Sequence, residues 1–108
     1  MHELSLASAI VETVERHAGG RRVAVVSLRI GALRQVVPDS LELYLELVGR
    51  GTVCEGARVE IEHVPARLAC CDGEWEPPSF RCPRCDGRGA VVAGDEFLVE
   101  SIEIEEAA

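Results

Sequence analysis

The chain has 108 residues, of which 47% are hydrophobic and only 4% aromatic, and its formal net charge is −8. This length fits one ordinary domain or two small ones, and the composition requires a core built from aliphatic side chains. The negative charge and the absence of lysine argue against nucleic acid as a partner, because binding to phosphates depends on Lys and Arg.

The sequence also bears on where the protein works. No apolar stretch approaches the roughly 20 residues that cross a bilayer, and the first residues lack the basic and long apolar regions of a secretory signal. We therefore expect a cytoplasmic protein without a membrane partner. Five cysteines in a reducing compartment favour thiolate–metal bonds over disulfides, and their odd number agrees with that interpretation.

The first part of the chain alternates helix and strand patterns. Apolar residues recur with helical spacing over residues 4–17, and a pair of glycines then ends the predicted helix. Alternating apolar and polar side chains predict a strand over 22–31. Pro38 opens a second predicted helix, in whose first turn its missing N–H is harmless, and the glycines within 49–51 end it.

The later part contains two more predicted strands and an insertion. Residues 57–64 and 97–105 have strand patterns, and the second of these is expected to rejoin the first sheet. Residues 66–94 are rich in Cys, Gly and Pro and too poor in aliphatic residues to hold their shape without a metal or disulfides. The sequence predicts an α+β fold: two helices packed on a three-stranded sheet, with an inserted zinc-ribbon-like module. The predicted domains are 1–65 with 95–108, and 66–94, and the two connections between them should act as a hinge.

Four of the five cysteines lie between positions 70 and 85. Cys82 and Cys85 form a C-x2-C knuckle, in which both thiolates point at one tetrahedral ion about 2.3 Å from each sulfur. Cys70 and Cys71 are adjacent, so their side chains tend to diverge. Both reach the same ion only through an unusual turn, for which Asp72 and Gly73 supply flexibility.

The ligand set is therefore left open at one position. If only one of the adjacent cysteines binds zinc, Asp72, Glu74 or His63 could complete four ligands. Four sulfur ligands leave no position for water, so we expect a structural zinc and no catalysis. The fifth cysteine, Cys54, is interpreted as a small buried hydrophobic residue.

A histidine at position 2 suggests a second metal site at the N-terminus. His2 places an imidazole, two backbone amides and a terminal amine within one compact loop. Such nitrogen donors favour square-planar Ni(II) or Cu(II) over zinc. From these residues alone, a frayed terminal histidine without a function is the simpler alternative.

Several motifs together resemble the HypA/HybF family, the nickel metallochaperones of hydrogenase maturation. They are Met1-His2-Glu3-Leu4-Ser5-Leu6-Ala7, Ile30-Gly31-Ala32-Leu33, Arg50-Gly51-Thr52, Glu55-Gly56-Ala57, Val64-Pro65-Ala66-Arg67, Arg81-Cys82-Pro83-Arg84-Cys85 and Ser101-Ile102-Glu103-Ile104. The resemblance runs essentially from end to end. The family usually carries two C-x2-C pairs, so the adjacent Cys70 and Cys71 are a departure, as though two residues between them were deleted.

The resemblance implies a nickel-binding domain and an inserted zinc domain. Ni(II) would be cargo held at Met1, His2 and Glu3, by the terminal amine, the His2 side chain and the backbone nitrogens of His2 and Glu3. Asp39 is the nearest counterpart of an acidic residue implicated in some members, although a solvent-facing carboxylate at a helix start explains it equally well. The implied partners are the GTPase HypB and the large-subunit precursor of NiFe hydrogenase, and exposed strand edges could also pair two copies of the chain.

Two other functions remain open at this point. A zinc-ribbon adaptor for protein or nucleic acid would transfer no nickel; its nucleic-acid form needs a basic face, and a lack of salt-dependent RNA and DNA binding would exclude that form. A thiol oxidoreductase would need a reactive, metal-free pair of Cys82 and Cys85, which near-stoichiometric bound zinc would exclude.

Overall fold

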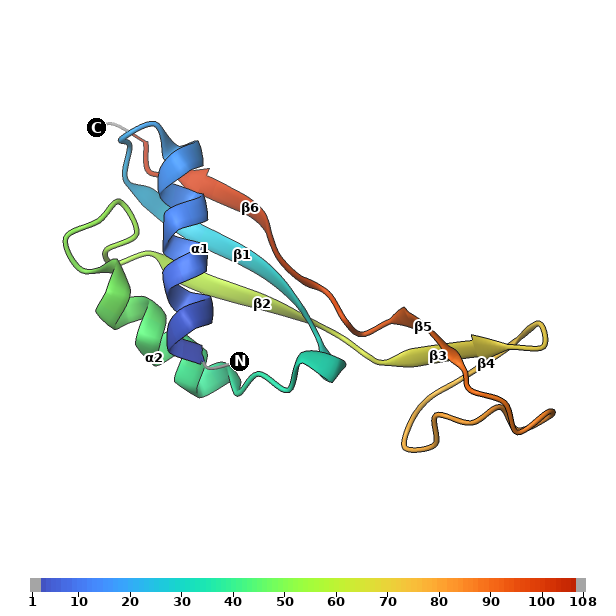
Figure 1. The fold of residues 1–108 in the computed structure, drawn as a ribbon. Helices are drawn as coiled ribbons and strands as arrows, with labels where there is room; N and C mark the ends of the chain where they lie inside the picture. Colours follow the sequence, from blue (N-terminus) through green and yellow to red (C-terminus); the bar gives the residue numbers. More distant parts are fainter. Residues whose placement is uncertain (1–2, 107–108) are drawn as a thin grey trace.

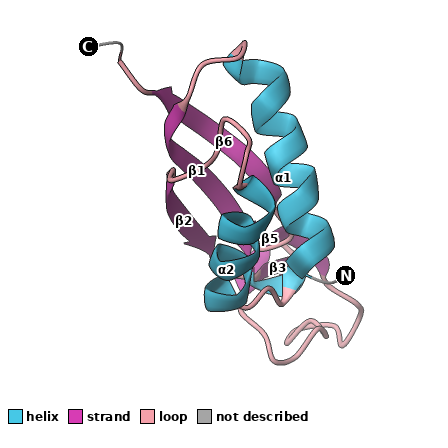
Figure 2. Ribbon diagram, turned by 90° about the vertical axis from the view of Figure 1, so that its left-hand side faces the viewer, coloured by secondary structure: helices cyan, strands magenta, loops and turns pink. Residues whose placement is uncertain are grey.

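A computed structural model of the chain describes residues 3–106. Two helices cover one face of a three-stranded sheet, and a second small sheet extends beyond one end of the first (Figures 1 and 2). This architecture confirms the predicted fold class. The elements in chain order are α1 (Glu3–Ala18), β1 (Val23–Gly31), a short 3-10 turn (Ala32–Arg34), α2 (Pro38–Gly49), β2 (Arg58–Val64), β3 (Arg67–Cys70), β4 (Gly73–Trp75), β5 (Ala90–Ala93) and β6 (Phe97–Ile104).

The two helices form where the apolar spacing predicts them. α1 buries Leu6, Ile10 and Val14 along one stripe, and Gly19, in the left-handed region with φ 62°, follows its last turn. α2 begins at Pro38, where the missing N–H leaves no hydrogen bond unmade. Neither helix in the described part of the chain is long and apolar enough to cross a membrane.

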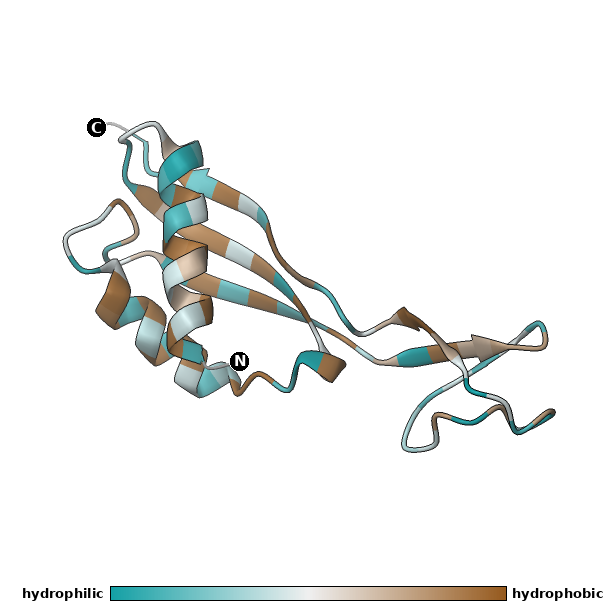
Figure 3. Cartoon of the chain, viewed as in Figure 1, coloured by the Kyte–Doolittle hydropathy of each residue, from teal (hydrophilic) through white to brown (hydrophobic). Residues whose placement is uncertain are grey.

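The first sheet has the order β2-β1-β6, with β1 parallel to β2 and antiparallel to β6. Val26, Leu28 and Ile30 of β1 point toward the helices and belong to the buried core. Alternate residues are polar or charged along β2 and at Ser27 and Arg29 of β1, and the hydropathy colouring shows this alternation along β2 (Figure 3). The helices therefore cover only one face of the sheet.

The second sheet lies within the segment that is rich in Cys, Gly and Pro and has the order β4-β3-β5. Its strands have only three or four residues, too few to show a clear alternation, which is why the sequence pattern does not reveal them. Leu68 is fully buried, and the indole ring of Trp75 lies against Gly89, where an added Cβ would come within 2.6 Å of it. Gly89 thus leaves the space that this ring fills.

The two sheets do not share a core. The molecule measures 59 × 23 × 18 Å and its radius of gyration is 17.2 Å, whereas a compact domain of this length has about 13 Å. The division at residues 66 and 95 and the hinge between the sheets stay predictions.

The backbone is closely packed where the sheets meet. The Gly31 amide donates to Glu96 O (2.7 Å) and the Leu33 amide to Gly94 O (2.7 Å). A Cβ on Gly31 would overlap the Gly94 carbonyl group, and a Cβ on Gly94 would overlap Ala66 Cα. The end of β1 therefore touches one of the two connections between the sheets, and that connection touches the other.

Candidate metal centre

A tight hairpin presents the two adjacent cysteines. Cys70 is the last residue of β3 and pairs with Gly73, the first residue of β4. The two residues between them, Cys71 and Asp72, have φ 51° and 59°. Positive φ at both central residues is the mark of a type I′ turn, whose twist matches that of the flanking strands. This is the unusual turn that adjacent cysteines require, and it directs both thiols to one side.

The second pair of cysteines lies in a knuckle closed by backbone hydrogen bonds. The Cys82 amide donates to Gly87 O (2.7 Å), and the Asp86 amide donates to Cys82 O (2.9 Å). Two more amides point at sulfur: Arg84 N–H donates to Cys82 Sγ and Gly87 N–H to Cys85 Sγ, both at 3.4 Å. Amides aimed at the sulfurs stabilise thiolates, the form that binds a metal.

The structure brings all four thiols together. Their sulfur atoms lie within 4.8 Å of one another, with 3.7 Å between Cys70 and Cys71 and 3.6 Å between Cys70 and Cys85. Four sulfurs placed tetrahedrally about zinc at about 2.3 Å would be roughly 3.8 Å apart. The donor type, number and spacing therefore fit a closed tetrahedral zinc site. His63, Asp72 and Glu74, the alternative ligands, are not members of this cluster.

The thiols differ in how readily they ionise. Backbone amides of Cys85 and Arg84, which donate to its sulfur, lower the pKa of Cys82 to about 7. Hydrogen bonds to Cys85, Cys82 and Cys71 raise the pKa of Cys70 to about 12. The pKa of Cys71 is also raised, first by its hydrogen bond to Cys85. Cys82 therefore loses its proton before Cys70 and Cys71, whose protons are held until a cation offsets the crowded negative charge.

Two arginines beside the cluster are residues that the sequence interpretation did not single out. Arg84 Nη1 lies 3.4 Å from Cys71 O, which it joins to the knuckle, and Arg81 Nη1 donates to Asp86 O at 3.0 Å. The Arg84 contact connects the two cysteine pairs, and the Arg81 contact stabilises the knuckle. Their only signal in the sequence is their position next to Cys82 and Cys85.

The predicted nickel residues lie only partly within the described chain. Met1 and His2 are outside residues 3–106, and Glu3 is the first residue of α1. Asp39 is an exposed residue in the first turn of α2. α1 and α2 begin at the same end of the helical layer (Figure 1).

Comparison with known proteins gives consistent matches along the whole chain. Residues 1–104 match the family described as "Hydrogenase/urease nickel incorporation, metallochaperone, hypA". A hydrogenase maturation factor HypA from Geobacter metallireducens is 44% identical over 110 residues, which are 97% of this chain and 100% of that protein. A HypA from Streptomyces avermitilis is 42% identical over 116 residues, covering 98% of this chain and 88% of the other.

Solved structures agree in fold. The solution structure of the Ni metallochaperone HypA from Helicobacter pylori has a TM-score of 0.72 and 23% identity, and the match covers 96% of this chain and 97% of that one. A second solution structure, of a HypA protein, has a TM-score of 0.74 at the same identity and covers 97% of both chains.

Proposed function

This chain belongs to the HypA family of nickel metallochaperones and hydrogenase maturation factors, and from that premise we propose that it binds Ni(II) at its N-terminus and delivers it to a NiFe hydrogenase. The proposed donors are the terminal amine of Met1, the His2 imidazole and the backbone nitrogens of His2 and Glu3. The observation that carries the proposal is the family match, which begins at residue 1 and so includes these three residues.

The proposed donor set suits a cargo that has to be surrendered. Amine, imidazole and deprotonated amide nitrogens favour square-planar Ni(II) over tetrahedral Zn(II). Because the amide nitrogens must be deprotonated to bind, protonation competes with nickel and provides a route for release. A site of this kind is distinct in chemistry from the four thiols, so two different metals can be sorted within one small protein.

We assign a structural zinc to Cys70, Cys71, Cys82 and Cys85. Four sulfurs fill the tetrahedral coordination of zinc and leave no place for water or substrate, so the proposed zinc holds the shape of the second sheet. We accordingly assign residues 66–94 to a zinc-binding domain and residues 1–65 with 95–108 to a nickel-binding domain. Below about 40 residues, a metal is a common requirement for a stable fold.

The proposed role involves transfer of a metal without catalysis. Its partners would be the GTPase HypB and the large-subunit precursor of NiFe hydrogenase, met in the cytoplasm. Asp39 is proposed as an accessory carboxylate of the nickel site. Two copies of the chain could also associate through their strand edges.

The test is nickel insertion in a strain that lacks the gene for this chain. Wild-type protein should restore nickel to the hydrogenase large subunit, and His2→Ala should not. His17→Ala is the matched control, since His17 is an exposed histidine of α1 whose Nδ1 is hydrogen-bonded to Thr13 O (2.8 Å). Full restoration by His2→Ala would contradict the proposal.

A further inference from the structure

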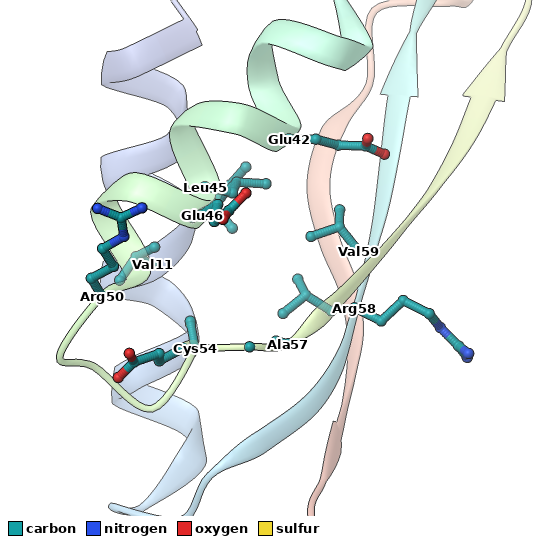
Figure 4. A pocket seen from close by; sticks show the side chains of 13 residues that line it. Val11, Glu42, Leu45, Glu46, Arg50, Cys54, Ala57, Arg58 and Val59 are labelled. Carbon is teal, nitrogen blue, oxygen red and sulfur yellow. The ribbon is translucent and has the colours of Figure 1, made fainter.

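A cleft of about 520 Å³ lies between α2 and β2 and is separate from the cysteine cluster. Its walls are mainly apolar, and its volume falls within the roughly 300–1,000 Å³ of ligand pockets. Val59 of β2 and Leu45 of α2 extend into the space from opposite sides (Figure 4). Cys54 lies at one end, where burial raises the pKa of its thiol, so it contributes a neutral, weakly polar wall.

The mouth of the cleft carries negative charge. Glu42 and Glu46 lie one turn apart on α2 and make no hydrogen bond or ion pair with other residues that the structure describes. Two arginines also line the cleft: the Arg58 guanidinium points away (Figure 4) and is 3.3 Å from Glu60, whereas Arg50 lies one turn beyond Glu46 and offsets part of the negative charge. A group that enters the cleft therefore meets two unpaired carboxylates and one arginine, so the charge at the mouth is negative on balance.

The strand beside the cleft is the outermost strand of its sheet. β2 pairs with β1 along its whole length, and its opposite edge faces no other strand in residues 3–106 (Figure 2). The unpaired backbone groups of such an edge are a template for an additional strand. On an added strand, alternate side chains would lie on the same face as Val59 and Ile61, which is the face that α2 covers.

We propose that β2 and the cleft together bind an extended segment of a partner protein whose alternate side chains, those on one face, are first apolar and then basic. The segment would add to the edge of β2 through backbone hydrogen bonds and place apolar side chains in the cleft. On that same face, the Lys or Arg side chains that follow the apolar ones would pair with Glu42 and Glu46 of α2. The proposal is independent of the proposed nickel transfer, because no residue of either metal site takes part.

Charge decides between a partner and a second copy of this chain. The net charge of −8 opposes self-association, and β2 itself carries Glu60 and Glu62 but only Arg58 as a strong base. A basic segment meets an opposite charge at the mouth of the cleft, whereas a second copy of β2 brings two further carboxylates. The geometry therefore favours a basic partner.

The test uses the zinc-loaded chain and the synthetic nonapeptide TVTVTKTKT, whose Val and Lys side chains share one face, with TVTVTETET as its charge-reversed control. We expect saturable binding of the first peptide and none of the second. Only alternate backbone amides of the bound peptide would face β2. Methylation of either the odd-numbered or the even-numbered amides of the first peptide should therefore abolish binding, and methylation of the other set should not. Hydrogen exchange should slow along β2 and stay unchanged along β6.

Paired variants distinguish an effect of the cleft carboxylates from an effect of the overall negative charge. E42Q/E46Q should weaken binding by roughly 3- to 30-fold, as expected for two exposed ion pairs, while E100Q/E103Q on β6 removes the same charge and should leave it unchanged. V59F should fill the cleft and weaken binding without changing the charge. Equal binding by the two glutamine variants, protection away from β2, binding of both peptides, or no binding would each overturn the proposal. A dimer through β2 that the peptide fails to dissociate would do so too.

Discussion

The close backbone contact between the two sheets can be tested by alanine substitution of three glycines. Gly31 has an ordinary extended backbone with φ −82°, so Gly31→Ala adds only the overlap of its Cβ with Gly94. Gly56 has φ +77° and nothing within 4 Å of an added Cβ, so Gly56→Ala adds only backbone strain. Gly94→Ala adds both, because Gly94 has φ +103° and its Cβ would overlap Ala66.

The expected losses follow from these two contributions. A non-glycine residue at positive φ costs about 1–3 kcal/mol, and overpacking against fixed atoms costs about 1–3 kcal/mol. Gly31→Ala and Gly56→Ala should each lower the free energy of unfolding by one such amount, and Gly94→Ala by about 2–6 kcal/mol. For a chain with about 5–15 kcal/mol in total, the last change removes a large part of the stability.

The measurement is urea unfolding of the zinc-loaded protein, followed by circular dichroism. Gly94→Ala should lose about as much stability as the other two variants combined. If Gly94→Ala loses no more than Gly56→Ala, there is room beside Ala66 and the contact between the connections is not tight.

Three further predictions concern the metal centre and the core. Cys71→Ser should reduce zinc affinity by more than roughly 100-fold, a larger loss than removal of a hydrogen bond to a zinc ligand causes, while Cys54→Ser should retain zinc. Equal zinc affinities of the two variants in a competition titration with a chromogenic chelator would remove Cys71 from the ligand set. Zinc affinity should rise with pH because bound thiols must lose their protons. Cys82, with a pKa of about 7, is already ionised well above pH 7, so calorimetry should find about one more proton released per zinc well below pH 7 than well above it. Proton release that does not change with pH would contradict the low pKa of Cys82. Leu28→Ala, at a fully buried position of β1, should lower the free energy of unfolding by about 2–5 kcal/mol, and a denaturation midpoint like that of the wild type would place Leu28 outside the core.

The helical layer and its sheet could be predicted because their patterns are long. α1 and β6 each show several turns or repeats of apolar spacing, and the predicted ends of the helices and strands of this layer lie within one residue of the observed ones. The strands of the second sheet are too short to give such a pattern. Cysteine spacing indicated a metal site there, but could not indicate β3, β4 or β5.

The adjacent cysteines show where sequence spacing alone is insufficient. Their convergence depends on positive φ at both Cys71 and Asp72, and neither residue requires that conformation. Contacts between distant backbone segments, such as Gly31 with Gly94, likewise have no local pattern. Cys54 was expected to be a buried hydrophobic residue; it is half-buried and packs at the edge of the core, where it lines the cleft.

The central claim is that one chain holds two metals by different chemistry, zinc permanently at four sulfurs and nickel in transit at terminal nitrogens. Native mass spectrometry of the chain supplied with both metals tests it directly, before and after brief exposure to a chelator, with a variant extended by one residue at the N-terminus as control. We predict one zinc and one nickel before the chelator, zinc alone afterwards, and zinc alone throughout for the extended variant. Stoichiometric nickel in the extended variant, or loss of both metals together, would contradict the account.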